Sequence, residues 1–155
     1  FFGHPVKRCS CSESAVTKYL NKVSGPLLDR IDIQIEVPPV QYDELVNKTK
    51  AESSENIRAR VESARAIQRE RFKGDGISSN AQMTAPMLKK YCELSEEASN
   101  YLKQGFEKLC LSGRAYDRIL KVSRTVADLA GHEKIEKNDI FSAISFRSLD
   151  RKYWS

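Results

Sequence analysis

Several kinds of functional residue are scarce or missing in this chain of 155 residues. The two histidines, His4 and His132, lie far apart in loop-like segments, so no Ser/His/Asp arrangement for nucleophilic catalysis is indicated. No GxxxxGK[ST] sequence occurs, and the chain therefore lacks a phosphate-binding P-loop. No apolar run approaches the ~18 residues that a membrane span needs. The first residues do not have the basic-then-apolar order of a signal peptide.

The cysteines are few and irregularly spaced, which predicts reduced thiols and a cytoplasmic location rather than a disulfide framework. Cys9 and Cys11 are candidate zinc ligands, but structural zinc takes four ligands and only this one pair is visible. The alternative is two ordinary thiols. Cys92 and Cys110 lie among apolar neighbours, and we expect both to be core thiols.

Charged residues make up 30% of the chain and hydrophobic residues 40%, which suits a helical protein without a membrane partner. The formal charge of +5 permits contact with nucleic acid, although many basic domains have no such partner. Because the sequence starts at Phe1 without a methionine, we expect a fragment of a longer protein.

The segment SGPLLDRIDIQIEV, residues 24–37, predicts an edge strand. After the Gly25-Pro26 turn, isoleucine and valine alternate with Asp, Gln and Glu from residue 31 onward. This period of two is typical of a strand with one buried face. Arg30 is expected at the start of the strand, where a rigid sheet would hold it toward a phosphate. The alternative is that Arg30 forms an ion pair with a neighbouring aspartate, Asp29 or Asp32.

Beyond Pro38-Pro39 the pattern indicates only helices. Proline cannot donate a hydrogen bond to a sheet and biases the preceding residue away from helix, so we place a domain boundary after residue 39. Expected helices cover residues 42–47, 54–72, segments that begin after Thr84 and after Ser95, a segment from Ser112 to Gly131, and residues 137–149; a short helix over 13–23 precedes the strand.

Two of these helices carry arginines that suggest binding. The helix over 54–72 has an apolar stripe of Ile57, Val61, Ala64 and either Ile67 or Gln68, and an arginine face of Arg58, Arg65 and Arg69. That face is either solvated and paired with glutamates or turned toward DNA. In the helix from Ser112, Gly113 and Arg114 lie in the first turn, where free N–H groups favour anions. Arg118 and Lys121 continue the face of Arg114.

Three blocks of sequence together resemble one known family. SGPLLDRIDI resembles the arginine-finger segment of the magnesium-chelatase-like branch of the AAA+ ATPases, most similar to the competence-associated ComM and YifB type. LSGRAYDRILKVSRTVADLAG, residues 111–131, resembles its sensor-2 helix. IEKNDIFSAISFRSLDR, residues 135–151, resembles its closing helix.

The resemblance implies a mostly α fold with two parts. Residues 1–39 would be the end of the α/β AAA+ core, comprising a loop, a helix and an edge strand, and residues 40–155 an all-helical C-terminal lid. Arg30 would be a catalytic arginine finger that acts in a neighbouring subunit. Gly113 and Arg114 would bind nucleotide, with Arg114 on the γ-phosphate held by its own subunit.

The resemblance also implies a ring, expected to be a hexamer, that uses ATP and Mg²⁺ and acts on DNA, as in branch migration during competence. The P-loop would lie upstream of Phe1, so the chain alone should be inactive and bind neither cofactor. Two alternatives remain at this point. One is a helical nucleic-acid-binding module that uses the arginine face of residues 58–69. The other is a zinc-bearing interaction domain built on Cys9 and Cys11.

Overall fold

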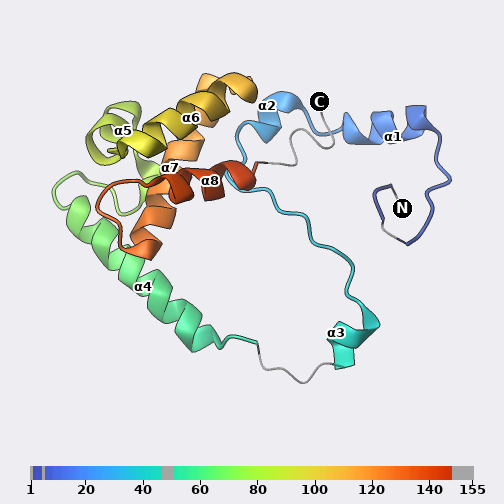
Figure 1. Ribbon diagram of the computed structural model, residues 1–155, viewed down its shortest axis with the longest axis horizontal. Coiled ribbons are helices and arrows are strands. Elements are labelled where there is room, and N and C mark those ends of the chain that lie inside the picture. Colours follow the sequence, from blue (N-terminus) through green and yellow to red (C-terminus); the bar gives the residue numbers. More distant parts are fainter. Residues whose placement is uncertain (1, 5, 47–50, 148–155) are drawn as a thin grey trace.

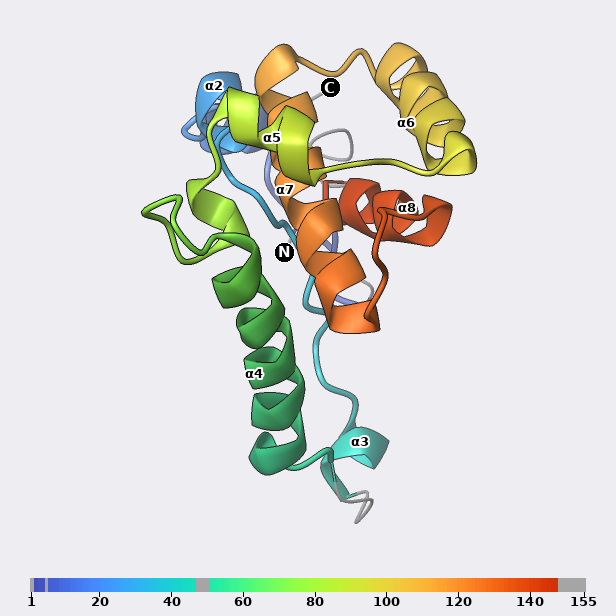
Figure 2. The ribbon, with the colours of Figure 1, turned by 90° about the vertical axis from the view of Figure 1, so that its left-hand side faces the viewer.

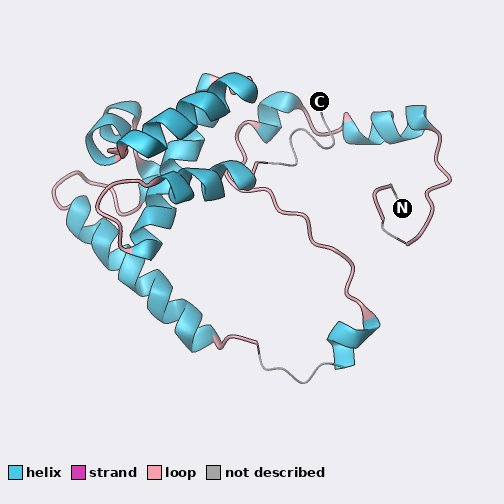
Figure 3. Cartoon of the chain, in the orientation of Figure 1, coloured by secondary structure: helices cyan, strands magenta, loops and turns pink. Residues whose placement is uncertain are grey.

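The computed structural model describes residues 2–4, 6–46 and 51–147. Its elements there are eight α-helices and one short 3-10 helix (Figure 1). Helices and loops account for nearly all of this part of the chain (Figure 3), and the one sheet-like feature is an isolated bridge between Leu94 and Ile135. The expectation of a mostly α fold is therefore confirmed.

The N-terminal region contains two short helices and little buried surface. Helix α1 spans Glu13–Leu20 and begins as expected at Ser12, whose hydroxyl accepts a hydrogen bond from the Ala15 N–H at 3.4 Å. No residue of α1 is buried. Helix α2 spans Gly25–Leu28 and has its proline in the first turn, where the missing N–H is not needed. Leu28 is its one buried residue.

The strand predicted over residues 24–37 is wrong for the described part of the chain. Its first residues form α2, and residues 33–41 are extended without a partner strand. A strand needs a neighbour to satisfy its backbone groups and to cover its apolar face, and the described residues provide none. Ile33 and Ile35 remain 52% and 65% exposed. The alternation of apolar and polar residues indicates a preference for a β-strand, but the described residues supply no strand with which it could pair.

Two helices follow the extended segment. Helix α3 spans Tyr42–Val46 and α4 spans Ser54–Arg71, close to the predicted bounds. Helix α4 projects from the rest of the molecule (Figure 2), and its residues 54–63 are all exposed. The predicted apolar stripe is therefore only half right. Ala64 and Gln68 are buried, whereas Ile57 and Val61 are 44% and 43% exposed.

The remaining elements form a helical bundle. They are the 3-10 helix η1 (Asn80–Gln82), α5 (Ala85–Tyr91), α6 (Glu96–Lys108), α7 (Gly113–Ala130) and α8 (Lys137–Ser145). The core combines Phe72, Met83, Leu88, Ala98, Leu102, Ile119, Leu120, Ala127, Ile135, Ile140 and Ala143. Helix α7 lies at the centre, between α4 and α5 on one side and α8 on the other (Figure 2).

Capping residues set the ends of these helices much as the sequence predicts. Ser95 and Ser112 accept hydrogen bonds from the N–H groups of Ala98 and Ala115. Gly131 ends α7 in the left-handed conformation, with φ of 75°, which glycine adopts without strain. Helix α8 ends at Ser145 rather than at Leu149, which lies outside the described residues.

The two candidate core thiols differ. Cys92 is buried, and burial raises the pKa of its thiol to about 11, whereas Cys110 is exposed and its prediction is wrong. Cys110 lies in the tight connection between α6 and α7, where its backbone has a positive φ of 45°. The described helices include none that is long and apolar enough to cross a membrane.

Candidate nucleotide-contact surface

The first turn of α7 exposes the two residues predicted to bind nucleotide. Ser112 is the N-cap, and Gly113 and Arg114 are exposed immediately after it. A Cβ atom added to Gly113 would meet nothing within 4 Å, so the space above this backbone is open. Free N–H groups, the positive end of the helix dipole and a guanidinium thus coincide at one accessible turn.

Arg30 follows the one-turn helix α2 instead of opening a strand. Its side chain is exposed, and its Nη1 donates a hydrogen bond to the Pro26 carbonyl oxygen at 2.8 Å. The predicted sheet that would have fixed this arginine is absent from the described residues. Arg30 is therefore oriented by its hydrogen bond to α2 and by the contacts that hold the neighbouring residues against the bundle.

Neither neighbouring aspartate pairs with Arg30 among the described residues, so the alternative ion pair is wrong. The Ser112 hydroxyl donates a hydrogen bond to Asp29 Oδ2 at 3.1 Å, and Arg147 Nη2 lies 3.7 Å from Asp29 Oδ1. Arg118 Nη1 donates to Asp32 Oδ1 at 2.9 Å. The two acids beside Arg30 are thus used to dock its segment onto the bundle.

Backbone contacts complete this docking. Arg147 Nη1 donates to the Ile31 carbonyl oxygen at 2.8 Å, and the Gln34 N–H donates to the Phe146 carbonyl oxygen at 2.7 Å. The chain following α2 consequently lies along the N-terminal end of α7 and the C-terminal end of α8 (Figure 1). The arginine-bearing turns of residues 30 and 114 are joined directly through Asp29 and Ser112.

The two further cations on α7 are engaged within the chain. Arg118 is occupied by Asp32, and Lys121 Nζ donates to the Ala81 carbonyl oxygen at 2.9 Å. Their spacing places both residues on the helix face of Arg114, but both side chains already have partners within the chain. Arg114 is the exposed cation at the start of that face.

A buried ionic network that sequence reasoning missed joins α4, η1 and α7. The carboxylate of Asp128 receives hydrogen bonds from Arg71, from Arg124 Nε at 3.0 Å and from Asn80 Nδ2 at 2.8 Å. Arg124 is 1% exposed and also donates to the His132 and Glu133 carbonyl oxygens. The signal was the i,i+4 spacing of Arg124 and Asp128 on the apolar side of α7.

The network lowers the pKa of Asp128. Burial alone would raise it, but the hydrogen bonds from Arg71 and Asn80 and the charges of Arg71 and Arg124 outweigh burial. The carboxylate therefore stays ionised in the interior, where it ties the C-terminal end of α4 to α7.

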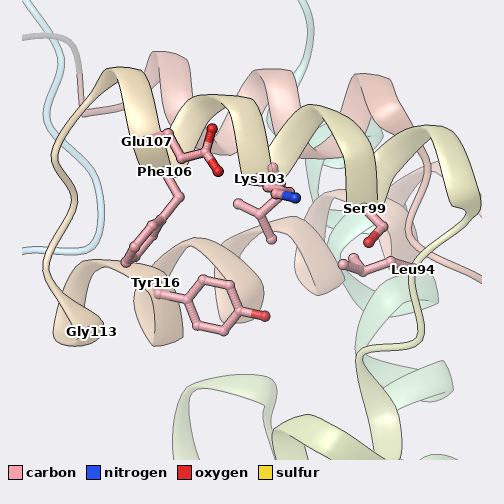
Figure 4. Close-up of a pocket in the computed structure, with 8 residues that line it drawn as sticks. Leu94, Ser99, Lys103, Phe106, Glu107, Gly113 and Tyr116 are labelled. Atoms are coloured by element: carbon pink, nitrogen blue, oxygen red, sulfur yellow. The ribbon is translucent and has the colours of Figure 1, made fainter.

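A groove of about 450 Å³ lies between α6 and α7 beside Gly113 (Figure 4). Phe106 and Tyr116 face it from the two helices, with ring centroids 6.0 Å apart in an edge-to-face arrangement. Lys103 and Glu107 lie on its α6 side. The groove is mainly apolar, so it offers a surface beside the α7 turn rather than a phosphate site.

The candidate zinc ligands do not gather into a site within the described residues, where no group of three or more His, Cys, Asp or Glu is placed for a metal ion. His4 Nδ1 accepts hydrogen bonds from the N–H groups of Val6 and Lys7 at 3.1 and 2.9 Å. Hydrogen bonding to the Cys11 backbone lowers the pKa of the Cys9 thiol.

Comparison with known families decides the relationship of the chain. Residues 51–147 match the C-terminal domain of the magnesium chelatase subunit ChlI, and residues 1–45 match the magnesium chelatase ChlI domain itself. The chain belongs to the magnesium chelatase ChlI family. The match of the bundle includes Gly113 and Arg114, and the match of the N-terminal region includes Arg30.

Individual relatives point to one branch of this family. The chain is 38% identical over 141 residues to competence protein ComM of Haemophilus influenzae. It is 36% and 35% identical to the YifB proteins of Escherichia coli and Salmonella typhimurium. Each alignment covers 90–91% of this chain but only 27% of the relative. The chain is thus related to ComM and corresponds to the C-terminal part of such a protein.

Proposed function

We propose that the chain is the C-terminal part of a ring-forming AAA+ ATPase, in which it supplies an arginine finger, Arg30, and a sensor-2 arginine, Arg114. The supporting observation is the Asp29–Ser112 hydrogen bond, which joins the turns of two exposed arginines that are 84 positions apart in sequence. Guanidinium groups suit phosphate oxygens because they form fork-like, charge-assisted hydrogen bonds.

The reaction is ATP hydrolysis, with ATP and Mg²⁺ as substrate and metal of the full-length protein. The chain has no P-loop, so the phosphate-binding loop and the metal ligands belong to the preceding core. Arg30 stabilises charge that develops on the transferred phosphoryl group of a neighbouring subunit's nucleotide. A finger that acts on a neighbour requires a ring, for which we propose a hexamer.

Arg114 binds the γ-phosphate, with the open backbone of Gly113 allowing close approach. Arg30 is one residue from Asp29, and Arg114 is two residues from Ser112. Because consecutive Cα atoms lie ~3.8 Å apart, the backbones of both arginines lie close to the Asp29–Ser112 hydrogen bond. This closeness favours one shared triphosphate over two nucleotides in separate subunit interfaces. Arg114 would then act on the neighbour's nucleotide together with Arg30, and not on one held by its own subunit.

The test is Arg30→Ala in the full-length protein. Turnover should fall by roughly 10³- to 10⁵-fold while nucleotide affinity is retained. Arg60→Ala is the matched control, because Arg60 is an exposed arginine on α4 that pairs with Glu52 and belongs to neither proposed binding surface. Adding P-loop-defective subunits with an intact Arg30 should partly restore turnover to the Ala variant. Normal turnover of the Ala variant by itself would remove the finger role.

The same mixing experiment with Arg114→Ala separates the two placements of that residue. Rescue by P-loop-defective subunits means that Arg114 acts on the neighbour's nucleotide. Loss without rescue means that it acts within its own subunit.

DNA is the substrate we propose for the motor, in a role such as branch migration, since one relative is named a competence protein. Arg58 and Arg65 on the projecting part of α4 are exposed and have no ion-pair partner among the described residues, whereas Arg69 and Arg60 pair with Glu62 and Glu52. If both contact phosphates, the double change to alanine should lower the salt slope of DNA binding by about 2. An unchanged slope would show that this face is only solvated.

A further inference from the structure

We propose that Arg147 and Arg118 are positioning residues for the arginine finger. Together they hold residues 29–32 against α7 and α8, and so fix Arg30 relative to Arg114. This inference rests on the proposed function for the role of Arg30 itself. It assigns a task to side chains that touch neither nucleotide nor reacting atoms.

Arg147 provides the inner contact. Its side chain is only 4% exposed, and its two terminal nitrogens reach the Ile31 carbonyl oxygen at 2.8 Å and Asp29 Oδ1 at 3.7 Å. One guanidinium therefore contacts the residues on both sides of Arg30. A buried arginine bonded to a backbone carbonyl is costly to release, so this contact is well suited to fix the turn.

Arg118 provides the outer contact from α7. Its Nη1 donates to Asp32 Oδ1 at 2.9 Å, two residues beyond Arg30, and the two side chains are 34% and 39% exposed. Arg118 is also one helical turn from Arg114, so a movement of the first turn of α7 would reach the finger segment through this pair. The Asp29–Ser112 hydrogen bond acts at the same end of α7.

These polar contacts matter because the described residues before and after the segment bury few apolar side chains against the bundle. Helix α1 has no buried residue, and Ile35, Val37 and Val40 are 65%, 78% and 62% exposed. Leu28 is the buried apolar anchor of α2. A finger must meet its phosphate with sub-ångström accuracy, since a misplacement of ~1 Å can cost about 10²-fold in rate.

The experiment compares Arg118→Ala, Asp32→Asn and Arg147→Lys in the full-length protein with Arg30→Ala and with Arg60→Ala, a control at an exposed arginine that pairs with Glu52. The first three variants should lower kcat for ATP by about 10- to 100-fold, with KM within about twofold, because phosphate positioning is lost while nucleotide binding remains. The charge swap Asp32→Arg with Arg118→Asp should recover turnover relative to Arg118→Ala.

Amide hydrogen exchange gives a second readout, because it separates local release of the segment that carries Arg30 from general destabilisation of the bundle. In Arg118→Ala, exchange should accelerate at residues 28–34 while the amides of α6 and α8 keep their protection. If Arg147→Lys fails to fold, the surface pair of Arg118 and Asp32 still decides the outcome. Normal kcat in both surface variants, together with collapse in Arg30→Ala, would overturn the positioning role and leave the proposed function intact. Normal kcat in Arg30→Ala would overturn the proposed function.

Discussion

The helical bundle and the N-terminal region treat the same kind of residue in opposite ways. In the bundle, Ile119 and Ile140 are 1% and 0% exposed. In the segment after α2, Ile33 and Ile35 are more than half exposed. The bundle buries a shared apolar core, whereas the N-terminal region contacts the bundle mainly through residues 28–34. Isoleucine is therefore buried where neighbouring helices supply a core, and it stays exposed in the segment after α2, where the described residues supply none.

The largest effect is expected from Asp128→Asn in the bundle. The change leaves Arg71 and Arg124 without their shared carboxylate, and Arg124 is almost fully buried. Removing one partner of a buried ion pair typically costs about 3–5 kcal/mol. Urea unfolding of the chain should show this loss. The matched control is Asp117→Asn on the same helix, which is only half-buried and should cost less than about 1 kcal/mol. Equal costs for the two changes would contradict the importance of the network.

The same change, isoleucine to alanine, can be made in the bundle core and in the segment after α2 to compare how much each region depends on packing. Ile140→Ala should lower the free energy of unfolding by about 2–5 kcal/mol, because it opens a cavity in the core. Ile35→Ala should change it by less than about 0.5 kcal/mol, as for other exposed positions. Thermal or urea unfolding of both variants provides the measurement. A comparable loss from Ile35→Ala would mean that the extended segment is packed in solution.

Thiol labelling should give the smallest and simplest distinction between the regions. Cys11 and Cys110 are exposed and should react readily with iodoacetamide at pH 8. Cys92 is buried with its pKa raised to about 11, so it should react only when the bundle unfolds. Mass spectrometry of the labelled peptides follows each site. Labelling of Cys92 at the rate of Cys110 would show that the bundle opens easily.

The success of sequence reasoning differs between the two regions for physical reasons. Helix starts at Ser95 and Ser112 could be predicted because a cap is a local interaction between neighbouring residues. The strand after Arg30 could not be placed, since a strand depends on partners elsewhere in the protein. The alternating isoleucines indicate a preference for a strand, but they do not indicate which segment would pair with it.

The candidate site shows the same limit. Gly113 and Arg114 were identified from the helix start and the family resemblance, and the structure leaves both of them exposed. The docking of Asp29 and Ile31 by Arg147 joins residues more than a hundred positions apart, and no local pattern announces it. Arg124 was also missed, although its place on the apolar side of α7 was visible in the helical spacing.

The most direct test of the central claim is a structure of the full-length protein assembled with a non-hydrolysable ATP analogue and Mg²⁺. The account predicts that the guanidinium groups of Arg30 and Arg114 from one subunit lie within hydrogen-bonding distance of phosphate oxygens of a single nucleotide bound by the neighbouring subunit. A ring in which both groups lie more than about 10 Å from every triphosphate, beyond any hydrogen bond, would contradict it.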